Sequence, residues 1–127
     1  MSANSPSILI VDDEPDVLDI CEKVLVKAGY TVFTAPNAAQ ARRLFDDEDL
    51  DLVILDIHMP EEDGISLLKH VHKMDPKLPA ILITGYAAVS SVLDAIRLNA
   101  REYLCKPFTM KKLLAVVESS LQPREDA

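Results

Sequence analysis

The chain has 127 residues, a size at which one compact domain is usual, and 49% of its residues are hydrophobic while 27% are charged. This composition excludes a disordered or low-complexity chain. Twenty-one acidic residues against 13 basic ones give a formal net charge of −8, which argues against direct binding of nucleic acid by this domain and favours protein partners.

The cysteines and the start of the chain bear on the cell compartment. Cys21 and Cys105 lie far apart and form no CxxC or Cys/His metal-binding spacing, so free packing thiols in a reducing cytoplasm are the simplest interpretation. Residues 1–7 lack the basic and apolar regions of a signal peptide, and no apolar run is long enough to span a bilayer. We therefore expect a cytoplasmic protein that does not bind membranes.

Strands and helices are expected to alternate in the first half of the chain. Residues 7–11 (SILIV) predict a strand that stops at an acidic cluster. From Pro15 the apolar residues through Ala28 recur on one helix face, and Gly29 ends that helix. Residues 31–35 (TVFTA) predict a second strand, and Asn37 is a suitable N-cap for the helix that follows.

The same alternation continues to the end of the chain. Residues 52–55 (LVIL) are uniformly apolar, as expected of a strand covered on both faces, and run directly into Asp56. After a loop at 58–63, a helix must end before Pro76 because proline disfavours helical geometry in the preceding residue. The remaining predicted elements are a strand at 80–84 (AILIT), a helix at 87–98, a short strand at 102–104, and a helix capped by Thr109.

This order of elements predicts an α/β fold. Alternating strands and helices form a parallel sheet with right-handed crossovers and helices on both faces. Five units suit a flavodoxin-like, doubly wound, five-stranded sheet, for which we adopt the strand order 2-1-3-4-5 as one of the two common arrangements.

Chemically active side chains follow four of the predicted strands. Because the carboxyl ends of parallel strands share one edge of a sheet, these side chains are expected to meet where the strand order reverses. They are Asp12, Asp13, Asp56, Thr84 and Lys106. Three carboxylates in one cleft raise each other's pKa unless a divalent cation neutralises them, and acidic oxygen ligands suit Mg²⁺. Asp56, beside a cation, a lysine and a hydroxyl, is equipped to attack a phosphoryl group.

At this point the sequence resembles the receiver domains of bacterial two-component response regulators. Four segments in order carry the resemblance: ILIVDDEPDVLDI, LVILDIHMPEEDGISLL, AILITGY and REYLCKPF. The resemblance covers nearly the whole chain and implies a receiver domain over residues 7–122, with flexible termini at 1–6 and 123–127.

The resemblance implies a role for each matching residue. Asp56 would accept the phosphoryl group, and the Mg²⁺ ligands would be Asp12, Asp13, Asp56 and the backbone carbonyl of His58. Lys106 would pair with phosphoryl oxygens, and its bond to Pro107 is expected to be cis.

A second set of implied properties concerns signalling. Thr84 would hydrogen-bond to the phosphoryl group, and Tyr103 would swing inward as Thr84 moves. The donor would be a phosphohistidine of a sensor kinase or phosphotransfer protein, and the altered surface would comprise the helix at 87–98, the strand at 102–104 and the last helix. Pairing of two copies through that surface is one arrangement the resemblance allows. Catalysis would be limited to the domain's own phosphorylation and dephosphorylation.

Other interpretations of these residues stay open. An acidic cluster is usually a solvated surface, Thr84 can be an ordinary strand residue, and Tyr103 is as well explained by core packing. A Mg²⁺-dependent phosphatase with an aspartyl-phosphate intermediate also places a nucleophilic aspartate after an apolar strand, but usually needs a second aspartate where this chain has His58. A flavin-binding module would need a phosphate-binding loop where Asp12 and Asp13 stand.

Overall fold

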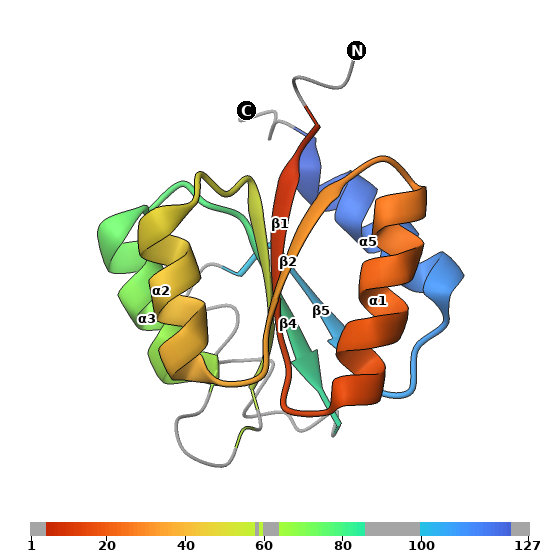
Figure 1. Cartoon of the computed structure of the whole chain (residues 1–127), viewed down its shortest axis with the longest axis horizontal. Coiled ribbons are helices and arrows are strands. Elements are labelled where there is room, and N and C mark those ends of the chain that lie inside the picture. The colour runs from red at the N-terminus through yellow and green to blue at the C-terminus, as the bar shows by residue number, and fades with distance from the viewer. Residues whose placement is uncertain (1–4, 58, 60–63, 86–99, 123–127) are drawn as a thin grey trace.

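A computed structural model of the chain describes residues 5–57, 59, 64–85 and 100–122. Its five strands form one parallel sheet in the order β2-β1-β3-β4-β5, with helices on both faces (Figure 1). The predicted flavodoxin-like fold and strand order are therefore confirmed. The elements are β1 (Ser7–Val11), α1 (Pro15–Lys27), β2 (Thr31–Ala35), α2 (Ala38–Asp47), β3 (Leu52–Asp56), α3 (Gly64–Met74), β4 (Ala80–Thr84), β5 (Glu102–Cys105) and α5 (Met110–Leu121).

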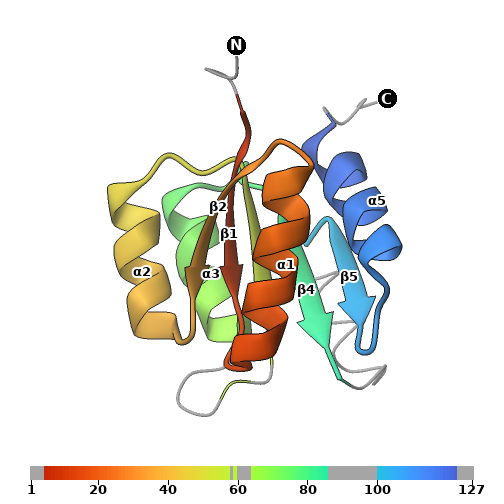
Figure 2. The same cartoon turned by 45° about the vertical axis from the view of Figure 1, so that its right-hand side comes forward.

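The sheet separates two hydrophobic cores. Alternate strand residues such as Leu55 and Leu82 face α2 and α3, while their neighbours Ile54 and Ile83 face α1 and α5. Figures 1 and 2 show these helix pairs on opposite sides of the sheet. Every residue of β3 and β4 is buried, which explains why their sequences are continuous apolar runs instead of alternating ones.

Local signals place the helix ends close to the predicted positions. The Asn37 side chain accepts a hydrogen bond from the backbone N–H of Gln40 at 2.9 Å, and the Thr109 hydroxyl accepts one from the N–H of Lys112 at 3.0 Å. Gly29 has a φ of 104°, the left-handed conformation that terminates helices. The prediction that Ala28 lies on the buried face of α1 is wrong, because this residue follows the last helical residue and is exposed.

Some predicted features fall outside the described residues. These are the helix at 87–98, the backbone carbonyl of His58, and most of the termini at 1–6 and 123–127. Within the part of the chain that the structure describes, the helices are all too short and too polar to cross a membrane.

The topology places the carboxyl ends of the strands together. All the strand arrows in Figures 1 and 2 point toward the same end of the molecule, whereas β1 begins and α5 ends at the opposite end. The order reverses between β1 and β3, since β2 lies on one side of β1 and the later strands lie on the other. The residues that end β1 and β3 therefore occupy the position where ligands bind in open α/β sheets.

Candidate functional site

Three carboxylates converge where β1 and β3 end. Val11 pairs with Leu55 in the parallel register, so Asp12 and Asp56 each stand one residue beyond a matched pair. One oxygen from each of Asp12, Asp13 and Asp56 lies within 4.8 Å of the others. Asp12 is fully buried and Asp56 is 3% exposed, while Asp13 reaches solvent. The predicted gathering of acids is thus present in the structure.

Three backbone features hold these acids in place. The N–H of Asp12 donates to the carbonyl of Ala35 at 3.2 Å, and the N–H of Glu14 donates to Asp12 Oδ1 at 2.9 Å. On the other side, Gly64 packs directly on the backbone of β3: a Cβ at this position would lie 2.3 Å from the carbonyl oxygen of Asp56. Only glycine allows α3 to begin so close to that residue.

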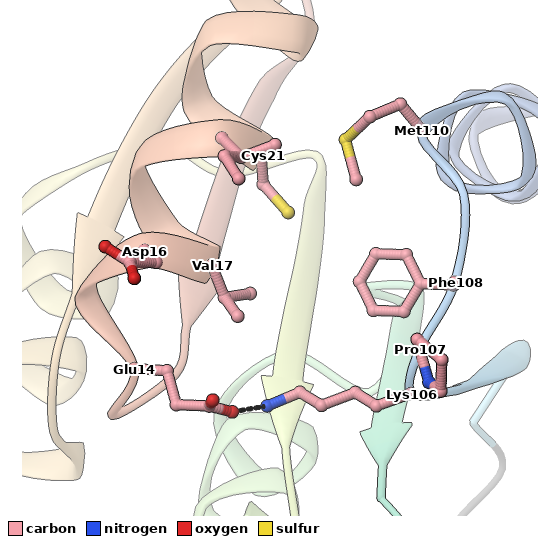
Figure 3. Close-up of a pocket in the computed structure, with 9 residues that line it drawn as sticks. Glu14, Asp16, Val17, Cys21, Lys106, Pro107, Phe108 and Met110 are labelled. Carbon is pink, nitrogen blue, oxygen red and sulfur yellow. Dashed lines mark hydrogen bonds and ion pairs between the residues drawn. The ribbon is translucent and has the colours of Figure 1, made fainter.

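Lys106 supplies the positively charged side chain of the site. Its Nζ lies 2.5 Å from Glu14 Oε1, 3.0 Å from Asp12 Oδ2 and 3.3 Å from Asp56 Oδ2 (Figure 3 draws the contact with Glu14). Its backbone N–H donates to the carbonyl of Thr84 at 2.7 Å, and its bond to Pro107 is cis, as expected. Lys106 therefore connects the end of β5 to the acids that follow β1 and β3.

The charges shift the pKa values of two groups. Burial lowers the pKa of the Lys106 ammonium, but the contacts with Glu14 and Asp12 and the charges of Asp12 and Asp56 raise it more, so it lies above its ordinary value. Burial raises the pKa of Asp12, and the nearby charge of Asp56 adds to this, whereas the Glu14 N–H and Lys106 oppose it. The net pKa of Asp12 is raised, mainly because burial disfavours its charged form.

Thr84 and Tyr103 lie on neighbouring strands beside this cluster. Thr84 ends β4 and is 2% exposed, and it follows Ile83, the register partner of Asp56. Tyr103 lies on β5 opposite Leu82 and is 43% exposed. Tyr103 is therefore not fully buried in the core, which counts against the interpretation of this residue as a core-packing aromatic.

The donor set fits a divalent cation. Three carboxylates and one ammonium carry a formal net charge of −2. Among the described residues, Asp12 Oδ2 is buried without a partner in hydrogen-bonding geometry, although Lys106 lies beside it as an ion pair. Burying a carboxylate oxygen without a hydrogen bond costs folding free energy unless a further positive group binds it. Carboxylate oxygens are suitable ligands for Mg²⁺.

An apolar groove of about 460 Å³ opens next to the cluster, between α1 and the segment that joins β5 to α5 (Figure 3). Val17 and Cys21 of α1 face Phe108 and Met110 across it. Lys106 and Glu14 stand at one end of this groove, so their contact is open to solvent and not sealed within the core.

Sequence reasoning missed two residues of the site. Glu14 was visible only as one more acid in a cluster, and its contact with Lys106 joins residues 92 positions apart. Gly64 follows an aspartate in the segment EEDG, which is typical of a turn, so the sequence indicated a loop residue and not a close contact with Asp56. His58, implied as a metal ligand, lies outside the described residues.

The sequence of this chain is similar to those of known regulatory proteins. The family model for the response regulator receiver domain matches residues 8–118. Regulatory protein AtoC of Escherichia coli is 39% identical over 115 residues, which cover 91% of this chain and 25% of AtoC. Transcriptional regulatory protein GltR of Pseudomonas aeruginosa is 35% identical over 124 residues, 96% of this chain and 51% of GltR. The chain thus spans a quarter to about half of the length of these relatives.

Solved structures agree with the family match. A CheY-like response regulator receiver domain protein of Methanospirillum hungatei superposes with a TM-score of 0.89 at 31% identity, covering 93% of this chain and 94% of that one. The response regulator TrrA of Thermotoga maritima, solved in complex with Mg²⁺-BeF, gives a TM-score of 0.82 at 34% identity over 91% of this chain and 99% of that one. With its fold, its acidic cluster and a family match over most of its length, this chain belongs to the response regulator receiver domains, the phosphorylated signalling domains of two-component systems.

Proposed function

We propose that Asp56 is the residue that accepts the phosphoryl group in this receiver domain. The observation that carries the proposal is the convergence of Asp12, Asp13 and Asp56 within 4.8 Å, with the Lys106 ammonium 3.3 Å from Asp56. Of the three acids, Asp56 is the one that ends the buried central strand β3 while keeping a carboxylate oxygen in contact with Lys106. It therefore combines a fixed position with a neighbouring positive charge.

The proposed donor is a phosphohistidine of a sensor kinase or phosphotransfer protein. An oxygen of Asp56 forms a bond to phosphorus while the bond between phosphorus and the histidine nitrogen breaks, leaving an acyl phosphate on Asp56 and a free imidazole on the donor. Lys106 pairs with a phosphoryl oxygen and Thr84 donates its hydroxyl hydrogen to another. This chemistry depends mainly on positioning and on neutralising negative charge, which the cluster supplies.

A Mg²⁺ ion completes the proposed site. Asp12, Asp13 and Asp56 would hold it, together with the backbone carbonyl of His58. The buried Oδ2 of Asp12, which pairs with Lys106 but has no partner in hydrogen-bonding geometry, supports this ligand set. When bound, the ion offsets the charge of the acids and of the incoming phosphoryl oxygens. The relative TrrA, solved with Mg²⁺-BeF, adds support from another member of the family.

We further propose that phosphorylation changes the surface formed by β5 and α5, together with the predicted helix at 87–98, which lies outside the described residues. Thr84 is buried one residue beyond the register partner of Asp56, and Tyr103 on the adjacent strand is 43% exposed, so its ring is not fixed in the core. In this proposal the Tyr103 ring moves inward when Thr84 turns toward a phosphoryl oxygen. The NMR signals of the Tyr103 ring should shift when beryllofluoride and Mg²⁺ are added. Thr84→Ala should abolish that shift, and an equal shift in this variant would disprove the coupling.

Intact mass measures the central step directly. The protein is incubated with Mg²⁺ and acetyl phosphate, and the wild type should gain one phosphoryl group while Asp56→Asn gains none. Labelling of Asp56→Asn to the wild-type extent would disprove the assignment.

The same samples distinguish a switch from an enzyme. A receiver domain modifies only itself, so a phosphate ester such as p-nitrophenyl phosphate should not be turned over. Sustained release of p-nitrophenol that is lost in Asp56→Asn would instead favour the phosphatase alternative.

A further inference from the structure

Glu14 makes the shortest contact of the Lys106 ammonium. Its Oε1 lies 2.5 Å from Nζ, compared with 3.0 Å for Asp12 and 3.3 Å for Asp56. Glu14 is not one of the gathered carboxylates, and its side chain is 57% exposed, whereas Asp12 and Asp56 are buried. Of these three acids, the one closest to the ammonium is thus the one that lies outside the carboxylate cluster.

The direction of the Glu14 side chain does not follow from the helix it precedes. Glu14 occupies the N-cap position of α1, but its side chain makes no capping hydrogen bond. Instead it extends across the end of the groove to Lys106 (Figure 3). Its backbone N–H is bonded to Asp12 Oδ1, so the Glu14 main chain is fixed to the acidic cluster while its carboxylate reaches the lysine.

The number of donors on the ammonium makes this contact important. A lysine ammonium has three N–H groups, and here three different carboxylates surround it. A phosphoryl oxygen on Asp56 can pair with Lys106 only by displacing one of them. Asp56 carries the phosphoryl group and Asp12 is fixed in the proposed cation site, which leaves Glu14 as the acid to be displaced.

We propose that Glu14 is a positioning residue that holds Lys106 on the α1 side of the site and competes with the phosphoryl group for its ammonium. This inference rests on the proposed function of Asp56 as phosphoryl acceptor. Glu14 slows formation of the acyl phosphate, because the Lys106–Glu14 contact must break as the phosphoryl oxygens arrive. It is a partner of the reactive groups and does not itself touch the phosphoryl group.

The test compares phosphorylation rates of matched variants. Glu14→Gln keeps the shape of the side chain but removes its negative charge, so the ion-pair attraction to the Lys106 ammonium is lost. With saturating Mg²⁺ and acetyl phosphate, an oxygen of Asp56 bonds to phosphorus and acetate leaves. Intact mass should show this gain about 2- to 5-fold faster in Glu14→Gln than in the wild type, the range for an ion pair with one half-exposed partner.

Asp16 provides the control for general electrostatics. It lines the same groove and carries the same charge, and it is not among the ion-pair partners of Lys106 in the described part of the chain. Asp16→Asn should react at the wild-type rate. An unchanged or slower rate in Glu14→Gln, or an equal acceleration in Asp16→Asn, would overturn the proposal. If the wild type gains no phosphoryl group, the proposed function fails instead.

A second measurement needs no phosphorylation. The NMR resonance of the Lys106 Nζ, assigned from its absence in Lys106→Met, should move in Glu14→Gln and stay in place in Asp16→Asn. A resonance that is unchanged by Glu14→Gln would show that the two side chains do not interact in solution and would also overturn the proposal.

Discussion

Replacement of Gly64 by alanine tests how closely the fold holds Asp56. The added Cβ would lie 2.3 Å from the carbonyl oxygen of Asp56 and 2.8 Å from the Cα of Ile57, both backbone atoms. Real Cβ contacts essentially never fall below 3.0 Å, so α3 or β3 must shift by about 0.7 Å. Overpacking of this kind costs about 1–3 kcal/mol.

Two assays measure the consequences of Gly64→Ala. With a net loss of about 2 kcal/mol and a urea slope of about 2 kcal/mol/M, the unfolding midpoint should fall by about 1 M. Since a misplacement of 1 Å can cost about 100-fold in rate, a shift of the Asp56 backbone should slow phosphorylation by acetyl phosphate about tenfold.

Gly85→Ala is the matched control for Gly64→Ala. A Cβ on Gly85 meets no described atom within 4 Å, so this variant should unfold at the wild-type urea concentration or slightly above it. Equal free energies of unfolding for Gly64→Ala and Gly85→Ala, within about 0.5 kcal/mol, would refute the argument that α3 packs tightly against the backbone of Asp56.

Three further predictions use other parts of the structure. Asn37→Ala should lower the free energy of unfolding by about 1 kcal/mol in urea titrations, because the cap on α2 is lost, and no change would contradict the role of that hydrogen bond. Burial raises the pKa of the Cys21 thiol to about 11, so at pH 8 iodoacetamide should modify Cys105 and leave Cys21 unmodified in mass spectra, whereas equal labelling would contradict the buried position. Mg²⁺ at ten times its Kd should stabilise the wild type by about 1.4 kcal/mol in thermal melts and should not stabilise Asp12→Asn, and an equal gain in both would exclude Asp12 as a ligand.

Much of the site was predictable because each of these reactive residues ends a strand or directly follows one. The positions of four of them follow from the rule that parallel strands end at one edge of the sheet. They are Asp12, Asp56, Thr84 and Lys106. The strand order itself is not contained in periodicity, and it was correct because the common arrangement applied.

Contacts between distant residues were not predictable. The pairing of Glu14 with Lys106 depends on the direction of one side chain at the start of α1, and the closeness of Gly64 to Asp56 depends on how α3 approaches β3. Neither the direction of a side chain nor the approach of a helix to a strand produces a periodic pattern in the sequence. The partial exposure of Tyr103 likewise depends on what covers β5, the edge strand of the sheet.

The complete burial of β3 and β4 determines where added volume can be accommodated. Close-packed interiors resist compression, and neither strand has a solvent-facing side into which it could yield. A bulky anion attached to Asp56 therefore cannot be absorbed by bending the centre of the sheet. The added volume must instead be accommodated beyond the ends of these strands.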